Sequence, residues 1–256
     1  MNLEQIRIVL VEPQLAGNIG SAARAMKTMG LGQLHLVNPQ QWPHPDAATM
    51  ASGADDLLQV ARVHDNLEGA LEGAGLVVGL SARTRNLSAP AEAPPQAARR
   101  VVEEAARHPV AVLFGRERTG LTNEEVDRCH RIVHIPANPE FSSLNLAAAV
   151  QVMSYELRQA ALAGEVVPQP ASEWPPATAD QMEQLFRHLE ETLVRIEFLR
   201  QENPRVLMRR LRLLFNRARP DHNEYQILRG ILAHVNMGME GSLPGQRAQS
   251  GQGDNG

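Results

Sequence analysis

Cysteine is almost absent from this 256-residue chain, in which Cys129 is the only one. No disulfide can form within the chain, and neither a zinc site nor an iron–sulfur cluster built on cysteines fits. The nine histidines are scattered and include no H-E-x-x-H pattern, so we expect no metal. A chain without disulfides suits a reducing compartment, and we expect it to be cytoplasmic.

Long apolar runs are missing as well. No stretch approaches the roughly 18 apolar residues of a membrane helix, and the N-terminus lacks the pattern of a signal peptide. We therefore expect no membrane partner. Aromatic residues are only 4% of the chain, but 43% of it is hydrophobic, so an aliphatic core can be buried. Lys27 is the only lysine, and the net charge is −4.

Short apolar runs alternate with helical patterns over residues 1–164. The runs are nearly continuous in Val, Ile and Leu, which is typical of strands buried on both faces of a parallel sheet. They span Ile6–Val11, Gln33–Val37, Leu76–Leu80, Val110–Phe114 and Arg131–Ile135. Helical segments between them include Gly20–Met29, Pro95–Arg107 and Leu144–Ala163. This order predicts an α/β domain with a mostly parallel sheet flanked by helices.

The rest of the chain has a different composition. Residues 165–178 hold four prolines and predict a linker that cannot be helical. Residues 179–240 predict a small all-helical domain with three helices, separated by breaks at Asn203-Pro204 and Arg219-Pro220. Asp180 is the predicted cap of the first helix, which we expect to reach about Glu202. The polar residues 241–256 predict a disordered tail.

Arginine is concentrated in this C-terminal part. Residues 195–219 contain eight arginines against two glutamates, which is the pattern expected of a surface that binds a phosphate backbone. A solvated helix face in a chain that uses arginine in place of lysine explains the same pattern.

The first motif that could carry chemistry runs from Glu12 to Arg24 and follows the first strand. The spacing Gly17-x-x-Gly20 is not the dinucleotide-binding fingerprint. Its glycines allow a tight turn that a ligand can approach closely, and Arg24 could reach a phosphate or a ribose hydroxyl at the strand end. An ordinary strand–turn–helix with a surface arginine is the alternative.

The second motif, Phe114-Gly115-Arg116-Glu117-Arg118-Thr119-Gly120-Leu121-Thr122, follows another buried strand. It has the glycine spacing of a P-loop, but Leu121 stands where the phosphate-binding lysine is needed, which excludes an NTPase. The motif predicts either a loop that exposes charge or simply the start of a helix, with Thr122 and Glu125 forming a capping box. The two interpretations are compatible.

The third motif runs from Ile135 to Ala147, and its prolines fix an extended turn before a long helix. Ser142 or Ser143 is the predicted cap of that helix, whose first N–H groups could also bind an acceptor on a ligand. Asn145 is a poor helix former, which indicates a further role. A fourth segment, Gly79–Arg85, ends a strand where α/β sheets bind ligands.

Taken in order, these motifs resemble the SpoU branch of the SPOUT RNA methyltransferases. The matching positions are Asn18, Gly20 and Arg24, then Phe114, Gly115, Glu117 and Gly120, and finally Ile135, Pro136, Ser143, Leu144 and Asn145. The resemblance spans the whole first domain. It is closer to the TrmJ type of tRNA (cytidine/uridine-2'-O-)-methyltransferase, on residues 8–12, 25–31 and 114–125 and on the arginine-rich extension.

The resemblance implies a trefoil knot, a homodimer whose sites use both chains, and S-adenosylmethionine as the methyl donor. It implies tRNA as the partner, with no role for DNA, and the ribose of nucleotide 32 in the anticodon loop as the target. The catalytic residues would be Arg24, Asn18, Glu117, Ser143 and Asn145. The cofactor would be held by Leu80, Ser81, Ala82, Gly115, Ile135, Ser142, Ser143 and Leu144. RNA would be bound by Arg83, Arg85, Arg116, Arg195, Arg205, Arg209, Arg210 and Arg212.

The pattern departs from the family at Leu80, where a small hydroxyl residue is expected. Backbone contacts to the cofactor tolerate leucine there, whereas a required side-chain hydroxyl would be lost. The alternatives are a ribosomal RNA 2'-O-methyltransferase and a non-catalytic RNA-binding protein of the same fold. A nicotinamide dehydrogenase fits less well because the dinucleotide fingerprint is missing.

Overall fold

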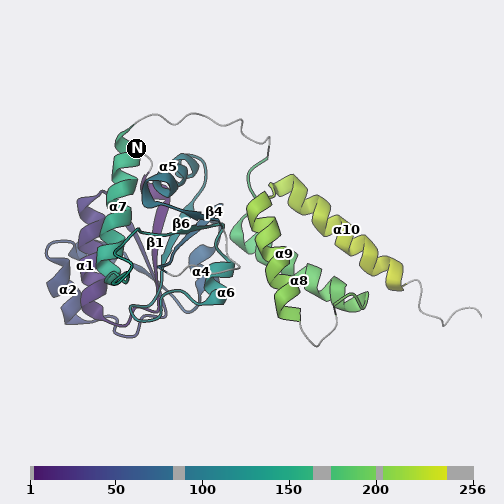
Figure 1. Ribbon diagram of the computed structural model, residues 1–256, viewed down its shortest axis with the longest axis horizontal. Coiled ribbons are helices and arrows are strands. Elements are labelled where there is room, and N and C mark those ends of the chain that lie inside the picture. The colour runs from purple at the N-terminus through teal and green to yellow at the C-terminus, as the bar shows by residue number, and fades with distance from the viewer. Residues whose placement is uncertain (1–2, 83–89, 164–173, 200–203, 241–256) are drawn as a thin grey trace, which may run out of the picture.

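A seven-stranded sheet forms the centre of the computed structural model, which describes residues 3–82, 90–163, 174–199 and 204–240. The strand order is β3-β2-β1-β6-β4-β7-β5, and every neighbouring pair is parallel (Figure 1). The strands are β1 (Ile6–Val11), β2 (Gln33–Val37), β3 (Arg62–His64), β4 (Leu76–Leu80), β5 (Ala91–Glu92), β6 (Val110–Phe114) and β7 (Arg131–Val133).

The predicted parallel sheet is confirmed, and four of the five predicted strands have the predicted bounds. The fifth, β7, ends at Val133 instead of Ile135, because the ladders to β4 and β5 both end at Val133. The pattern missed β3 and β5, which lie at the two sheet edges and are only three and two residues long. Runs this short are too brief to show a periodicity.

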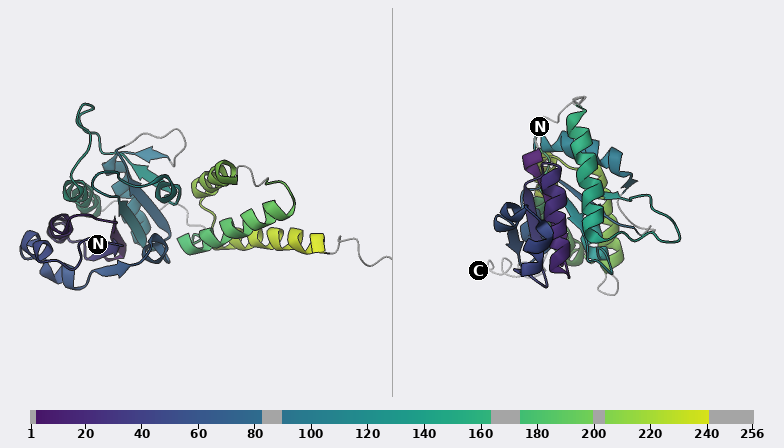
Figure 2. Two further views of the ribbon diagram at one scale, coloured as in Figure 1. Left: turned by 90° about the horizontal axis from the view of Figure 1, so that it is seen from below. Right: turned by 90° about the vertical axis from the view of Figure 1, so that its left-hand side faces the viewer.

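Helices cover both faces of the sheet. One face carries α1 (Ala16–Thr28), α5 (Pro94–Ala105) and α7 (Leu146–Leu162), whose apolar side chains pack on Ile6, Ile8 and Leu10 of β1. The other face carries the short helices α4 (Leu67–Leu71) and α6 (Asn123–Asp127), which pack in the same core as Val9 and Val11. Two further short helices, α2 (Pro45–Ala51) and α3 (Asp55–Gln59), lie on the outer side of α1, and a 3₁₀ turn (Leu3–Gln5) precedes β1 (Figures 1 and 2).

The glycines of the first motif have a different role from the predicted one. Helix α1 begins at Ala16, so Gly17 and Gly20 lie on the helix and not in a turn. A Cβ added at Gly20 would lie 2.0 Å from the carbonyl oxygen of Ala47 in α2. Gly20 therefore permits close packing of two helices, and no ligand is needed to explain it.

The C-terminal part forms three helices, α8 (Ala179–Arg195), α9 (Pro204–Ala218) and α10 (His222–Glu240), which we call the helical extension. Thr178, not Asp180, is the N-cap of α8, and its N–H donates to Gln181. The Asp180 carboxylate instead accepts a hydrogen bond from the N–H of Gly73 in the first domain. Helix α8 ends at Arg195, earlier than predicted, and Glu197 after it has a positive φ.

The helical extension packs beside α4 and α6, on the side of the sheet away from α1 (Figure 1). Its own core is small and centres on Phe186, Leu185 and Tyr225. The predicted linker lies partly, and the predicted tail wholly, outside the described residues. None of the helices in the described ranges is long and apolar enough to cross a bilayer.

Candidate active site

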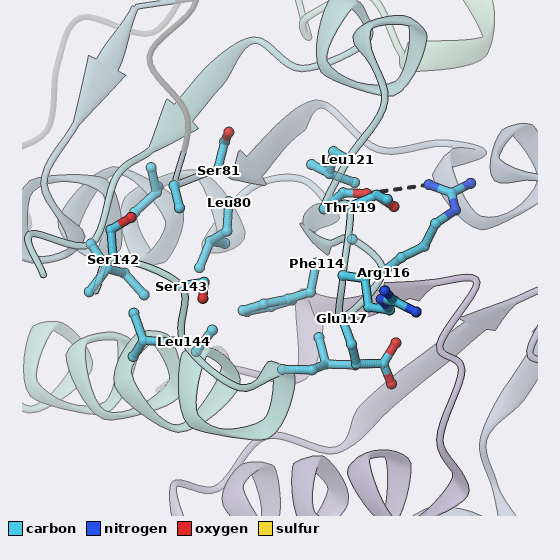
Figure 3. Close-up of a pocket in the computed structure, with 18 residues that line it drawn as sticks. Leu80, Ser81, Phe114, Arg116, Glu117, Thr119, Leu121, Ser142, Ser143 and Leu144 are labelled. Atoms are coloured by element: carbon cyan, nitrogen blue, oxygen red, sulfur yellow. Dashed lines mark hydrogen bonds between the residues drawn. The ribbon is translucent and has the colours of Figure 1, made fainter. Parts of the chain in front are cut away.

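A cavity of about 230 Å³ opens at the carboxyl ends of β4, β6 and β7. It is lined by all eight residues that the family resemblance assigned to the cofactor: Leu80, Ser81, Ala82, Gly115, Ile135, Ser142, Ser143 and Leu144. Figure 3 shows residues 142–144 on one side and the 116–121 loop on the other, with Leu80 and Phe114 between them. The second motif, the third motif and the segment after β4, which are far apart in sequence, therefore share one crevice, at the sheet edge where α/β proteins bind ligands.

The loop after β6 is tightly folded, and this explains its two glycines. Arg116 and Gly120 form an antiparallel bridge, and Gly120 has a φ of +68°. A Cβ added at Gly115 would lie 2.2 Å from the backbone of both Gly120 and Leu121. The loop therefore closes on itself and presents its backbone to the cavity. The capping box of Thr122 and Glu125 that begins α6 is confirmed.

Glu117 joins the second motif to the first. Its carboxylate accepts hydrogen bonds from the backbone N–H of Gln14 at 2.9 Å, from that of Leu15 at 3.1 Å, and from Asn18 Nδ2 at 3.0 Å. Its negative charge also lies beside the first turn of α1, where the helix dipole favours it. Glu117 therefore fixes the start of α1 relative to the loop that lines the cavity.

Asn145 joins the third motif to the same group. Its Nδ2 donates to Asn18 Oδ1 at 3.0 Å, while its own Oδ1 accepts from the N–H of Ala147 at 2.9 Å. Asn145 is thus the N-cap of α7, and the prediction that Ser142 or Ser143 caps this helix was wrong. Hydrogen bonds thus link Glu117, Asn18 and Asn145 in a row, which we call the carboxamide chain after its two asparagine side chains. This row ties the first, second and third motifs together beside the cavity.

The electrostatics of Glu117 follow from these contacts. Partial burial alone would raise the pKa of its carboxyl, but the hydrogen bonds from Asn18, Gln14 and Leu15 favour the charged form and outweigh it. The net pKa is lowered, so Glu117 is ionised at neutral pH. An ionised carboxylate with its acceptors occupied is suited to positioning, not to taking a proton from a substrate.

Arg116 lies differently from the prediction that assigned it to RNA. Its side chain is only 15% exposed, and its guanidinium pairs with Glu12 at 2.8 Å and with Glu125 at 3.0 Å. Hydrogen bonds to these two carboxylates raise its pKa above that of an ordinary arginine. The neighbouring Arg118 is exposed and also lines the cavity. Arg118 is therefore the exposed member of the pair, and Arg116 is held by carboxylates of its own chain; sequence alone does not show which side chain turns inward.

Arg24 is exposed on α1, about two turns beyond Asn18, and is not among the residues that line the cavity. Ser143 does line it. The described part of the chain therefore brings four of the five predicted catalytic residues together and leaves Arg24 apart. Arg83 and Arg85, predicted to bind RNA, lie outside the described residues.

The arginines of the helical extension separate into two groups. Arg209 pairs with Asp127 of α6 at 2.7 Å, Arg219 pairs with Glu104 of α5 at 3.0 Å, and Arg212 pairs with Glu183 and lies over the Phe186 ring. In contrast, Arg195, Arg205, Arg210 and Arg217 are exposed. Half of the arginine cluster in α9 and just beyond it is thus used to hold the chain together.

The chain was compared with known proteins. Residues 5–155 match the SpoU rRNA Methylase family, and residues 180–250 match the C-terminal domain of the tRNA methyltransferase TrmJ. The chain belongs to the TrmJ group of SpoU methylases. Over 244 residues it is 50% identical to the tRNA (cytidine/uridine-2'-O-)-methyltransferase TrmJ of Escherichia coli K12, covering 94% of this chain and 98% of that protein.

Solved structures agree with this assignment to the TrmJ group. The crystal structure of TrmJ from Zymomonas mobilis ZM4 superposes with a TM-score of 0.78 at 36% identity, over 90% of this chain and 98% of that one. A second structure, described as giving insights into the 2-OH methylation of C/U34 on tRNA, has a TM-score of 0.50 at 30% identity. The alignment spans 97% of that chain but only 62% of this one. The fold is therefore the SPOUT fold; the knot stays a prediction.

Proposed function

We propose that this chain is a tRNA 2'-O-methyltransferase that uses S-adenosylmethionine. The observation that carries the proposal is the carboxamide chain, which joins the three motifs of the TrmJ group beside one cavity. The activity named for the E. coli relative, which aligns along almost the whole chain, supports it. A non-catalytic protein would have no need to keep this arrangement of polar groups.

The residues of the cavity fit S-adenosylmethionine. Leu80, Phe114 and Leu144 offer apolar surface for a flat base, while Ser81 and Ser142 offer hydroxyl groups for polar ends of the molecule. The Leu80 side chain has no hydroxyl group, so any polar contact to a ligand at that position would have to come from its backbone. When bound, the cofactor supplies a methyl group on a positively charged sulfur for transfer to a ribose 2'-oxygen.

Arg24 is the residue we propose to orient the target ribose and its phosphate. Arginine is a poor general base, because its pKa is above about 12. The proton of the 2'-hydroxyl therefore passes to a phosphate oxygen that Arg24 holds. Since Arg24 is apart from the cavity of its own chain, we propose that it serves the cavity of a second copy in a homodimer. Ser143 and the carboxamide chain would position the reacting groups.

The exposed arginines of the helical extension are proposed to bind the tRNA backbone. Arg210 and Arg217 are seven residues apart on α9, and so share one helix face. Contacts of this kind add affinity that decreases with salt and carry no base preference. Arg209 and Arg212 were predicted in the same role, but their ion pairs within the protein make them weaker candidates.

Nucleotide 32 of the anticodon loop is the proposed target. The solved relative concerned with C/U34 aligns over 97% of its own length but covers only 62% of this chain, so well over a third of this chain has no counterpart in it. A structural difference that large gives a reason for a different nucleotide to be presented. The family description also names ribosomal RNA, so that substrate is the second candidate.

Methyl transfer from labelled S-adenosylmethionine to unmodified tRNA, and separately to ribosomal RNA, tests the proposal. We expect 2'-O-methylation only in tRNA, mapped to nucleotide 32. Methylation at nucleotide 34, or only in ribosomal RNA, would refute the proposed target but leave the proposed 2'-O-methyl transfer standing. Arg24→Ala should lower kcat at least a hundredfold with unchanged cofactor binding. The matched control is Arg107→Ala, at an exposed arginine two residues beyond the end of α5, and this variant should behave as wild type.

A further inference from the structure

Helix α6 lies between the helical extension and the cavity. It is only five residues long, Asn123–Asp127, and directly follows the loop that lines the cavity. Figure 1 shows it facing α9, and the two helices are in contact. A helix this short has little stability of its own, so its position depends on the side chains that hold it at each end.

The end of α6 near the cavity is held by Arg116. Glu125 accepts two hydrogen bonds from the Arg116 guanidinium, both at 3.0 Å, in the planar paired geometry that fixes direction as well as distance. Beyond the other end of the helix, the buried Cys129 packs on β4. A Cβ added at Gly79 would lie 2.6 Å from Cys129 Sγ. Gly79 directly precedes Leu80, so the segment that contains α6 follows the end of β6 and, just after the helix, packs on the end of β4, two of the three strand ends at the cavity.

The opposite side of α6 is held by α9. Arg209 Nε donates to the carboxylate of Asp127, with distances of 2.8 and 2.7 Å to its two oxygens. Asn216 Nδ2 donates to the carbonyl oxygen of Asp127 at 3.0 Å and lies 3.5 Å from that of Cys129. Asp127 and Asn216 are 8% and 4% exposed. These are buried, directed contacts between two domains, unlike surface ion pairs that contribute little.

We propose that α6 couples tRNA bound on the helical extension to the affinity of the cofactor cavity, with Asp127 as the positioning residue. This inference rests on the proposed function. Phosphates that bind the exposed face of α9 restrict its movement. Through Arg209 and Asp127, the same restriction reaches α6, and through Glu125 and Arg116 it reaches the loop after β6. A cavity whose loop is already ordered binds its ligand with a smaller entropic cost.

The test uses the full chain and S-adenosylhomocysteine, the product that S-adenosylmethionine becomes on losing its methyl group, so that no turnover occurs. Calorimetry measures its Kd with and without saturating unmodified tRNA, and the ratio of the two values is the coupling factor. We expect a factor of about five or more for wild type, in the usual range for coupled sites. Asp127→Asn should bring the factor below about two while leaving the tRNA Kd within about twofold.

The chain offers a matched control in Glu104→Gln. It removes the carboxylate that pairs with Arg219, so it also breaks an ion pair between the two domains, but on α5 instead of α6. This variant should keep the wild-type coupling factor. The double variant Asp127→Asn with Arg209→Gln should show no lower coupling than Asp127→Asn alone, because the two side chains act as one contact.

Three results would overturn the inference: a coupling factor near one for wild type, a retained factor in Asp127→Asn, or an equal loss in Glu104→Gln. The last would mean that domain docking in general, and not α6, is responsible. Failure of the proposed function can be told apart from failure of this inference. In the first case wild type would transfer no methyl group to tRNA, which would overturn both the proposed function and the inference. Failure of the inference alone leaves methyl transfer intact.

Discussion

Replacing Glu117 with glutamine perturbs the group at which the first two motifs meet. The carboxylate accepts hydrogen bonds from three groups, the N–H of Gln14, the N–H of Leu15 and Asn18 Nδ2. Glutamine keeps one acceptor oxygen but turns an NH₂ toward groups that also donate. At least one hydrogen bond to a charged acceptor is lost, at a cost of about 1.5–3 kcal/mol. For a chain of this size, Tm should fall by about 3–12 °C.

The pH dependence of this effect follows from the lowered pKa of Glu117. A carboxyl whose native pKa is below its unfolded value contributes stability that is complete above the unfolded value of about 4.3. That contribution is lost as the pH falls through the native pKa. The Tm difference between wild type and Glu117→Gln should therefore be full at pH 7 and shrink at pH values below about 4.

Thermal unfolding and steady-state methyl transfer would be measured together. Because the variant loosens α1 and the α7 cap relative to the cavity, kcat/KM should also fall by about ten- to a hundredfold. Glu140→Gln is the matched control, since Glu140 is exposed in the third motif and should tolerate the change. A Glu117→Gln protein with wild-type Tm at pH 7, or with a Tm difference that grows in acid, would refute the reasoning.

Three other predictions concern single positions. Gly115→Ala should abolish cofactor binding by calorimetry, because its Cβ would lie 2.2 Å from the loop backbone, while Gly32→Ala, with nothing within 4 Å, should bind normally. Asn145→Ala should lower the free energy of unfolding in urea by about 1–2 kcal/mol, because a helix cap is lost; no change would contradict its role as N-cap. Arg210→Ala should weaken tRNA binding, and lower the slope of log affinity against log salt concentration by about one, without changing Tm. Arg212→Ala should instead lower Tm, because it removes an ion pair within the helical extension. The reverse result would contradict the division of these arginines into exposed and ion-paired groups.

The strands were predictable because their signal is local. Residues 6–11 and 110–114 are nearly continuous runs of buried apolar residues, and such runs form strands buried on both faces wherever the sheet order places them. The cap at Thr122 was predictable for the same reason, since both partners of the capping box lie within four residues. The lining of the cavity was expected from the family resemblance, and the geometry brings those residues together.

What the sequence determined by itself was therefore the set of local elements: the buried strands, the breaks between helices and the motifs that follow each strand. Tertiary structure decided which partner each polar side chain found. Asn145 caps α7 and bonds Asn18, 127 residues away, and Arg209 pairs with Asp127 across a domain boundary. Gly20 likewise meets Ala47 of another helix. Such partners are set by how the elements pack in space, and no local sequence pattern shows which residues far apart in the chain come together.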